Sequence, residues 1–117
     1  MYKKLTYVVL MLLVLGLGAN KTYAADGADI SSLTTQEDFG VVYNECGVTK
    51  NALTILKNRG IDIARIRLFV NPRTEPQDLA YVIALAARCK TAGMQVMLCI
   101  QYSDTWADPG QQAKPSS

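Results

Sequence analysis

After residue 47, the apolar positions of the chain alternate between a helical period and a strand period. In residues 48–60, VTKNALTILKNRG, the apolar side chains recur on one helical face: Ala52, Leu53, Ile55 and Leu56. Thr49 is a suitable N-terminal cap, and Gly60 stands just past the end, where a left-handed residue is favoured. The pattern therefore predicts a helix in this segment.

A second helix is predicted in residues 75–93, EPQDLAYVIALAARCKTAG. Pro76 suits the first helical turn, where its missing N–H costs nothing. The helix is expected to pack four side chains on one face: Leu79, Val82, Ile83 and Ala86. Gly93 is expected just past its end.

Three segments have the character of strands. Residues 61–70, IDIARIRLFV, form a β-branched run that Asn71 and Pro72 end. Residues 94–100, MQVMLCI, form a buried apolar run, and GADIS at 27–31 is a short candidate for the first strand. Strands that alternate with helices of this length are typical of parallel βαβ units, so the predicted class is α/β.

Alternation within residues 61–70 separates two different faces. One face is aliphatic, with Ile66, Leu68 and Val70; the other carries Arg65, Arg67 and Phe69. In an open sheet covered by helices on both sides, two buried arginines would be costly without paired acids. In a barrel the same face is the interior, which lines the active-site mouth. The pattern favours a barrel, with a solvent-exposed edge strand as the alternative.

The strand at 94–100 continues with the same parity into a polar loop. Its helix-facing row is predicted to be Val96, Leu98 and Ile100, and its inward row Met97, Cys99 and Gln101. The loop that begins with Tyr102, Ser103 and Asp104 follows the C-terminal end of this strand. That end is where α/β folds bind their ligands.

This loop combines aromatic and acidic side chains. Tyr102 and Trp106 offer flat apolar faces on which a pyranose can stack, and Asp104 and Asp108 offer acceptors for its hydroxyls. The alternative is that Trp106 anchors the loop and the aspartates form turns. A catalytic pair of Asp104 and Asp108 is disfavoured, because glycoside hydrolysis needs a defined carboxyl separation that one irregular loop does not predict.

The N-terminal segment has the layout of a secretory signal peptide. Lys3 and Lys4 precede an apolar run at residues 5–19, and small residues follow, so cleavage is expected after Ala24. The alternative is an uncleaved anchor, although the run is shorter than the roughly 20 residues of a spanning helix. We therefore expect a secreted or periplasmic protein with no stable membrane association after cleavage.

Charge and residue inventory exclude several classes of function. Removal of residues 1–24 lowers the count of basic residues from 12 to 9 against 10 acidic ones, which leaves no electrostatic reason to bind nucleic acid or anionic lipid. The absence of histidine and of a CxxC pair excludes a zinc ligand set and a Ser-His or Cys-His nucleophile. We expect no cofactor and no metal. Three cysteines imply a free thiol or an intermolecular bridge: Cys46, Cys89 and Cys99.

Three quoted stretches carry a family resemblance. YSDTWADPG, preceded by RIRLFVNP and by GADIS, closely resembles family 53 of the glycoside hydrolases, the arabinogalactan endo-β-1,4-galactanases, over residues 27–115. The resemblance implies a secreted enzyme that cuts the β-1,4-galactan side chains of pectin. It also implies a (β/α)₈ barrel of which this chain holds strands one to three. The family's retaining mechanism uses two glutamates, at the ends of strands four and seven, which this chain lacks.

The resemblance carries over to individual residues. Arg67 matches the second arginine of the strand-two motif, Asp104 and Trp106 match the loop after strand three, and Asp29 and Ser31 match the end of strand one. With Tyr102, the predicted substrate-binding set is complete: Asp29, Arg67, Tyr102, Asp104 and Trp106. No catalytic residue is predicted in this chain.

Two inward positions depart from the family pattern. Cys99 stands where the family has an aspartate, and Gln101 where it has a histidine. The loss of the acid is expected to leave Arg65 and Arg67 short of a partner. Two acidic residues that precede the first predicted helix, Glu37 and Glu45, are not expected to replace the missing catalytic pair.

The predicted organisation is a signal peptide at residues 1–24 and a partial family 53 barrel domain at residues 25–117. Because three strands cannot close a barrel, the chain alone is expected to be marginally folded and without galactanase activity. One alternative is a degenerate, non-catalytic carbohydrate-binding remnant, which the departures at Cys99 and Gln101 favour. Another is a small secreted α/β domain with an unrelated role.

Overall fold

A computed structural model describes residues 24–116, so the predicted signal peptide lies outside the described residues except for Ala24. The strands of this part are β1 (Asp26–Asp29), β2 (Asn44–Glu45), β3 (Val48–Thr49), β4 (Ile61–Phe69) and β5 (Gln95–Gln101). The helices are α2 (Leu33–Asp38), α3 (Ala52–Asn58) and α4 (Leu79–Thr91). No helix among residues 24–116 is long and apolar enough to cross a membrane.

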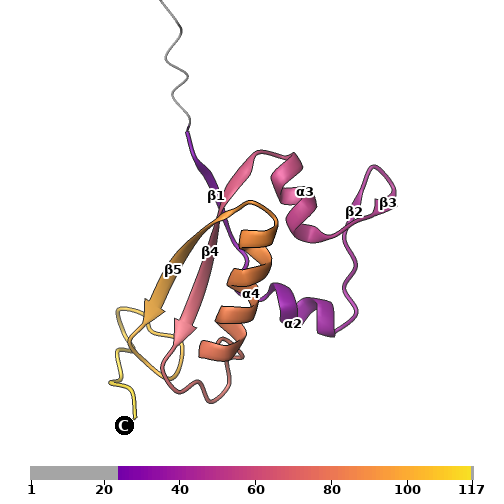
Figure 1. The fold of residues 1–117 in the computed structure, drawn as a ribbon. Helices are drawn as coiled ribbons and strands as arrows, with labels where there is room; N and C mark the ends of the chain where they lie inside the picture. Colours follow the sequence, from indigo (N-terminus) through magenta and orange to yellow (C-terminus); the bar gives the residue numbers. More distant parts are fainter. Residues whose placement is uncertain (1–23, 117) are drawn as a thin grey trace, which may run out of the picture.

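The main sheet has three parallel strands in the order β1-β4-β5, which confirms the prediction of parallel βαβ units. Helix α4 runs along β4 and β5 on one face, and β4 and β5 end side by side, next to the C-terminal loop, whereas β1 ends earlier, opposite Arg65 (Figure 1). The register sets Ala28 beside Ala64 and Arg67 beside Cys99. The last residues of β4 and β5 are therefore neighbours across the sheet, whereas the last residue of β1, Asp29, lies opposite Arg65.

The core lies between the sheet and its helices. Its most buried members come from β4 and α4, and their relative solvent-accessible surface area is 0%: Ala64, Ile66, Leu85 and Cys89. Ile66 therefore faces the helices, as its parity predicts. The buried face of α4 is Val82, Leu85 and Cys89, whereas Leu79 and Ile83 are 61% and 60% exposed. The predicted face of this helix is thus wrong for those two residues.

Exposure along the helix-facing rows also differs from the prediction. Val70 is 49% exposed because β4 ends at Phe69, so the alternation does not extend to it. On β5, Val96 packs against the core, but Leu98 and Ile100 are 46% and 45% exposed. The helices described here leave the C-terminal half of β5 uncovered.

Both long helices begin at a cap other than the predicted one. Asn51 caps α3 by accepting from the amide of Leu53 at 2.9 Å, whereas Thr49 lies in β3. Asp78 caps α4 by accepting from the amide of Tyr81 at 2.8 Å. Pro76 precedes that cap and is not in the first turn, because the aspartate oxygen next to the free amides decides where the helix starts.

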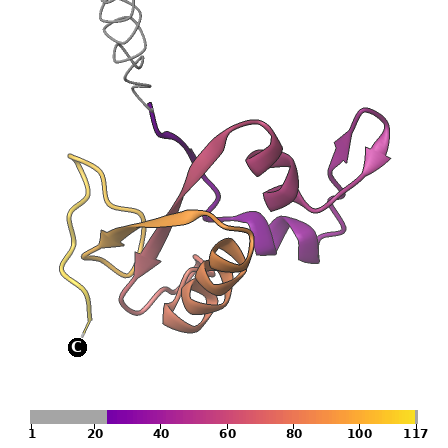
Figure 2. The same cartoon turned by 45° about the horizontal axis from the view of Figure 1, so that its top comes forward.

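A short helix and a hairpin, α2 and β2–β3, fill the segment between β1 and α3, where no element was predicted. The hairpin stands away from the main sheet (Figure 2). The carboxylate of Glu45 stabilises the open end of the hairpin, where it accepts from Lys50 at 2.8 Å and from Arg59 at 3.1 Å. Hydrogen bonds from Lys50, Asn58 and Arg59 lower the pKa of Glu45 to about 2, so it is ionised in all but strong acid.

Candidate functional site

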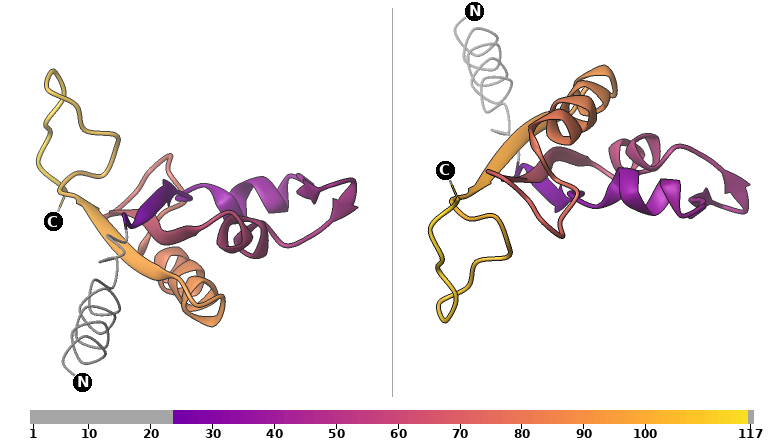
Figure 3. Two further views of the ribbon diagram at one scale, coloured as in Figure 1. Left: turned by 90° about the horizontal axis from the view of Figure 1, so that it is seen from above. Right: turned by 90° about the horizontal axis from the view of Figure 1, so that it is seen from below.

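The candidate site lies where β1, β4 and β5 end, on the sheet face that carries the arginines. Because the strands are parallel, their C-terminal residues point the same way, and Asp29 at the end of β1 comes within 3.7 Å of Arg67 near the end of β4. The loop after β5 leaves this edge and extends away from α2 and α3 (Figure 3). Three predicted site residues come from these elements: Asp29 from β1, Arg67 from β4 and Trp106 from the loop.

Asp29 is the acid that joins the strand ends. One carboxylate oxygen accepts from the Ser31 hydroxyl at 2.6 Å and from the Ser31 amide at 3.0 Å. The other accepts from Arg65 and lies 3.7 Å from Nε of Arg67. Burial raises the pKa of the Asp29 carboxyl, but the bonds from Ser31 and the charges of Arg67 and Arg65 outweigh it, so the pKa lies below its ordinary value.

The expectation that Arg65 and Arg67 lack an acidic partner is therefore wrong. Asp29 supplies the negative charge from the neighbouring strand, since it is opposite Arg65 in the β1–β4 register. Cys99 also contacts this group, and its sulfur accepts from Arg65 Nη2 at 3.0 Å. The two arginines thus have an acidic partner although position 99 holds a cysteine.

Arg67 connects this acid to the aromatic loop. Its guanidinium carbon lies 4.8 Å from the ring centroid of Trp106, which is a cation–π contact. The side chain of Arg67 is 21% exposed, and Trp106 is 47% exposed. One ring face thus rests near the guanidinium while much of the indole remains open, as a stacking surface for a sugar requires.

Asp104 has a structural partner for each of its oxygens. Oδ1 accepts from the amide of Asn71 at 3.0 Å, and Oδ2 accepts from the Ser116 amide at 2.8 Å and hydroxyl at 2.6 Å. These bonds, led by that of the Ser116 hydroxyl, lower the pKa of the Asp104 carboxyl. Asp104 therefore holds the loop in place, and its predicted contact with sugar stays a prediction.

Tyr102 and Asp108 lie apart from the acid–arginine group. Tyr102 is 77% exposed and lines a surface hollow of about 500 Å³ with residues 107–109 and Gln112. Asp108 accepts from the amide of Gly110 at 2.7 Å. It therefore forms a turn, which was the alternative to sugar binding for this residue. The structure brings Asp29, Arg67 and Trp106 together and does not bring Tyr102 or Asp104 into the same contacts.

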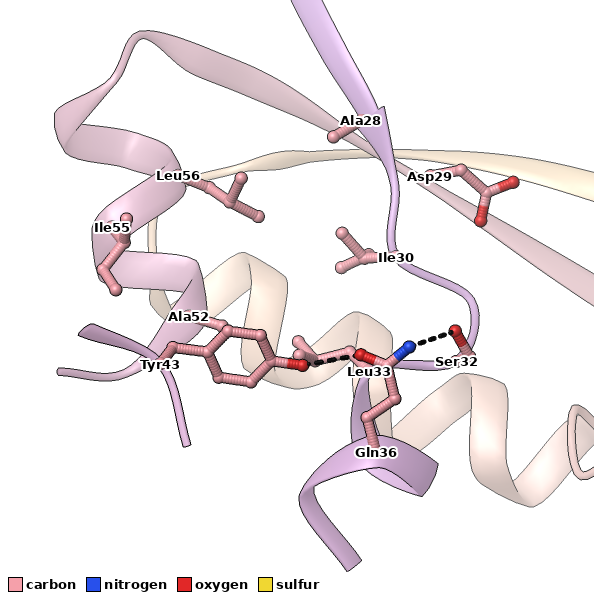
Figure 4. A pocket seen from close by; sticks show the side chains of 10 residues that line it. All are labelled: Ala28, Asp29, Ile30, Ser32, Leu33, Gln36, Tyr43, Ala52, Ile55 and Leu56. Carbon is pink, nitrogen blue, oxygen red and sulfur yellow. Dashed lines mark hydrogen bonds between the residues drawn. The ribbon is translucent and has the colours of Figure 1, made fainter. Parts of the chain in front are cut away.

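A separate cavity of about 270 Å³ lies between β1, α2 and α3 (Figure 4). Most of its lining is apolar, and the carboxylate of Asp29 points away from these apolar side chains (Figure 4). Its polar side is closed by Tyr43, whose hydroxyl donates to Gln36 at 2.8 Å. The cavity offers packing space on the helix side of β1 and no pair of groups suited to acid–base chemistry.

The two acidic residues considered as substitutes for a catalytic pair are engaged elsewhere. Glu37 on α2 accepts from both terminal nitrogens of Arg88 on α4, at 2.7 and 2.9 Å. Glu45 belongs to the hairpin, as described above. No group of three or more Cys, Asp or Glu side chains within residues 24–116 is arranged to hold a metal ion.

Sequence reasoning missed Ser31 as the residue that orients Asp29. The spacing Asp-x-Ser was a local signal, because an aspartate readily accepts from the backbone and side chain two residues ahead. All three cysteines are free in the chain: Cys46 is exposed on the hairpin, Cys89 is buried and Cys99 is half-buried. Burial raises the pKa of the Cys89 thiol.

Comparison with known protein families shows to which family the chain belongs. Residues 25–117 match the family model described as glycosyl hydrolase family 53. The chain belongs to this family. It is 50% identical over 91 residues to the arabinogalactan endo-beta-1,4-galactanase A of Emericella nidulans, and 42% identical over 108 residues to that of Aspergillus niger.

These family 53 relatives are much longer than the chain. The matches cover 77% and 92% of this chain, but only 26% and 31% of the two relatives. Among solved structures, the chain is similar to one from a study of two fungal beta-1,4-galactanases, with a TM-score of 0.76, 39% identity and coverage of 80% and 28% of the two chains. An Ignisphaera aggregans GH53 catalytic domain gives a TM-score of 0.71, 34% identity and coverage of 77% and 28%.

The described fold therefore corresponds to the first three βα units of the family 53 (β/α)₈ barrel. The prediction that these strands belong to a barrel, and not to an open sheet, is confirmed. In such a barrel the arginine face of β4 is the interior, and the ends of β1, β4 and β5 border the active-site mouth.

Proposed function

We propose that this chain forms one wall of the galactan-binding cleft of an exported family 53 glycoside hydrolase. The observation that supports the proposal is the contact series from Asp29 through Arg67 to Trp106, at the barrel end where (β/α)₈ enzymes have their active sites. Carboxylates and arginines supply hydrogen bonds to sugar hydroxyls, and the half-exposed indole supplies a stacking face.

In this proposal the wall binds substrate, and the bond-breaking carboxyls lie on other strands of a barrel. Retaining hydrolysis of β-1,4-galactosidic bonds needs two carboxyl groups roughly 5 Å apart across the scissile bond. Glu37 is paired with Arg88, and Glu45 with Lys50 and Arg59, so neither faces Asp29 in the cleft as a free acid. A second candidate, a non-catalytic galactan-binding protein, has the same binding wall and is favoured by Cys99, which provides no carboxylate beside Arg65.

The test is galactan binding and hydrolysis by the full chain after signal removal. We expect migration to slow in a native gel that contains β-1,4-galactan and to remain unchanged in one that contains cellulose, with no release of reducing sugar. Glu37→Gln is a matched control, because it alters the α2–α4 ion pair away from the strand ends and should leave the retardation unchanged. Equal migration in both gels would contradict the binding proposal, and sugar release above a protein-free blank would contradict the assignment of catalysis to other strands.

Export is a separate part of the proposal and has its own test. Expression of the full sequence in a secreting host should yield an exported protein whose N-terminal residue is Ala25. Edman sequencing of the exported material measures this directly. A mature protein that begins at Met1, or one that stays in the membrane fraction, would contradict cleavage after Ala24.

A further inference from the structure

Gln77 is a buried polar residue next to the candidate site, and none of the functions above uses it. It lies in the connection between β4 and α4, directly before the Asp78 cap, and it is 3% exposed. Glutamine is mostly found on protein surfaces. A side chain of this kind that is nearly inaccessible is held by specific contacts.

Those contacts join the C-terminal ends of two strands. The backbone oxygen of Gln77 accepts from the amide of Phe69, the last residue of β4, at 3.0 Å. Its side-chain Nε2 donates to the backbone oxygen of Ser31, just past β1, at 3.1 Å. Ser31 itself is fully buried. Gln77 therefore fixes the position of Ser31 relative to the end of β4.

Ser31 in turn decides the direction of the Asp29 carboxylate. Its hydroxyl donates to Oδ1 of Asp29 at 2.6 Å and accepts from the backbone amide of Arg67 at 2.9 Å. With Oδ1 held in this way, Oδ2 is left facing Arg65 and Arg67. A shift of Ser31 would move the acid that lies beside the guanidinium under Trp106.

The use of an amide at position 77 has a cost that packing alone does not explain. Oε1 of Gln77 is buried and has no hydrogen-bond partner among the described residues. A buried acceptor without a partner destabilises the folded state, and an apolar side chain of similar length would avoid this cost. Such a side chain could not donate to Ser31, because only the amide nitrogen meets that carbonyl oxygen.

We propose that Gln77 is a positioning residue for sugar binding, which holds Ser31 so that Asp29 is aimed at Arg67 beneath Trp106. The proposal rests on the galactan-binding function proposed above. It predicts that the polar group of Gln77 acts through the Asp29 carboxylate and not through general stability.

The first variant is Gln77→Met, which keeps the length of the side chain and removes both polar atoms. We expect galactan affinity to fall roughly fivefold, the effect of about one hydrogen bond. The pKa of Asp29, followed by NMR, should rise toward its ordinary value, because the Ser31 bonds that lower it are weakened. Acrylamide quenching of Trp106, which is the single tryptophan of the chain, should increase.

A partner variant and a control complete the design. Ser31→Ala removes the hydroxyl that contacts Asp29 and should change the same three measurements, while the double variant should add little, because both residues act through one carboxylate. Gln95→Met makes the same chemical change at an exposed position where β5 begins and should change none of them.

The outcomes separate this proposal from the function on which it rests. A folded Gln77→Met protein with unchanged affinity, Asp29 pKa and quenching would overturn the positioning role. If Gln77→Met does not fold, Ser31→Ala decides, and an unchanged Asp29 pKa in that variant would overturn it. If the unaltered chain does not bind galactan, the proposed function fails, and the ligand-free Asp29 pKa and Trp106 quenching still decide whether Gln77 positions the acid.

Discussion

Replacement of Asp29 by asparagine will strongly weaken galactan binding and will loosen the contacts between the strand ends. The amide keeps the shape of the carboxylate but removes the charge that Arg65 and Arg67 share. Two adjacent guanidiniums will then repel each other, and Arg67 will leave its place below Trp106. We expect galactan affinity to fall by roughly tenfold or more, as for removal of one partner of a partly buried charge pair.

The loss of stability in Asp29→Asn will be smaller and will depend on pH. The Asp29 side chain is 33% exposed, so solvent screening limits the contribution of these contacts to about 1 kcal/mol. Because the folded state lowers the pKa of Asp29, its contribution is present above the unfolded value of roughly 3.9 and is lost as the pH falls through the folded value. Urea unfolding at pH 7 and pH 3 should therefore show a difference from the unaltered chain that shrinks in acid.

Asp26→Asn provides the matched control for this experiment. Asp26 lies on the same strand, at its exposed N-terminal end, and no salt bridge is formed by it among the described residues. Its replacement should leave both binding and stability unchanged. Equal effects of the two variants, or a difference that is as large at pH 3 as at pH 7, would show that Asp29 does not act as the shared counter-ion.

Replacement of Trp106 by alanine is expected to weaken galactan binding by tenfold or more with little effect on folding. The indole is 47% exposed and provides the large flat face near Arg67 on which a sugar ring can stack. Because much of the side chain is already in contact with water, we expect the free energy of unfolding to change by less than about 1 kcal/mol. Affinity electrophoresis in galactan and urea unfolding measure the two effects separately.

Three further variants test whether stacking is the cause. Trp106→Phe keeps an aromatic face and should retain part of the affinity, whereas Tyr102→Ala removes an aromatic ring that lies outside the acid–arginine contacts and should have a smaller effect. Arg67→Lys keeps the positive charge but loses the planar group that faces the indole, so it should resemble the alanine variant at Trp106. Full affinity in Trp106→Ala would contradict a stacking role for the loop.

The elements that could be predicted are those with a strong local period. The runs that became α3, β4, α4 and β5 were recognised because their apolar residues repeat at intervals that the backbone geometry itself imposes. Their starting points were less predictable. Thr49 and Pro76 were locally acceptable, but Asn51 and Asp78 presented the side-chain oxygens that accept from the free helical amides.

The short elements before α3 could not be predicted in the same way. Helix α2 spans 6 residues and strands β2 and β3 span 2 residues each, which is too short for a period to be detected. The hairpin turn places Cys46 at φ 51° and Gly47 at φ 78°. Cysteine is uncommon at a left-handed backbone position, so the residue types did not predict this turn.

The sequence by itself determined the parallel α/β class, the two faces of β4 and the loop of aromatic and acidic residues that follows β5. Each of these depends on residues close together in the chain, where side-chain direction follows from backbone period. Only the tertiary structure decided that Asp29 is the counter-ion of Arg65 and Arg67, that Asp104 accepts hydrogen bonds that hold its own loop, and that Gln77 donates to Ser31. Those contacts join residues 12 to 46 positions apart, and their partners are set by strand register and packing, which no single segment contains.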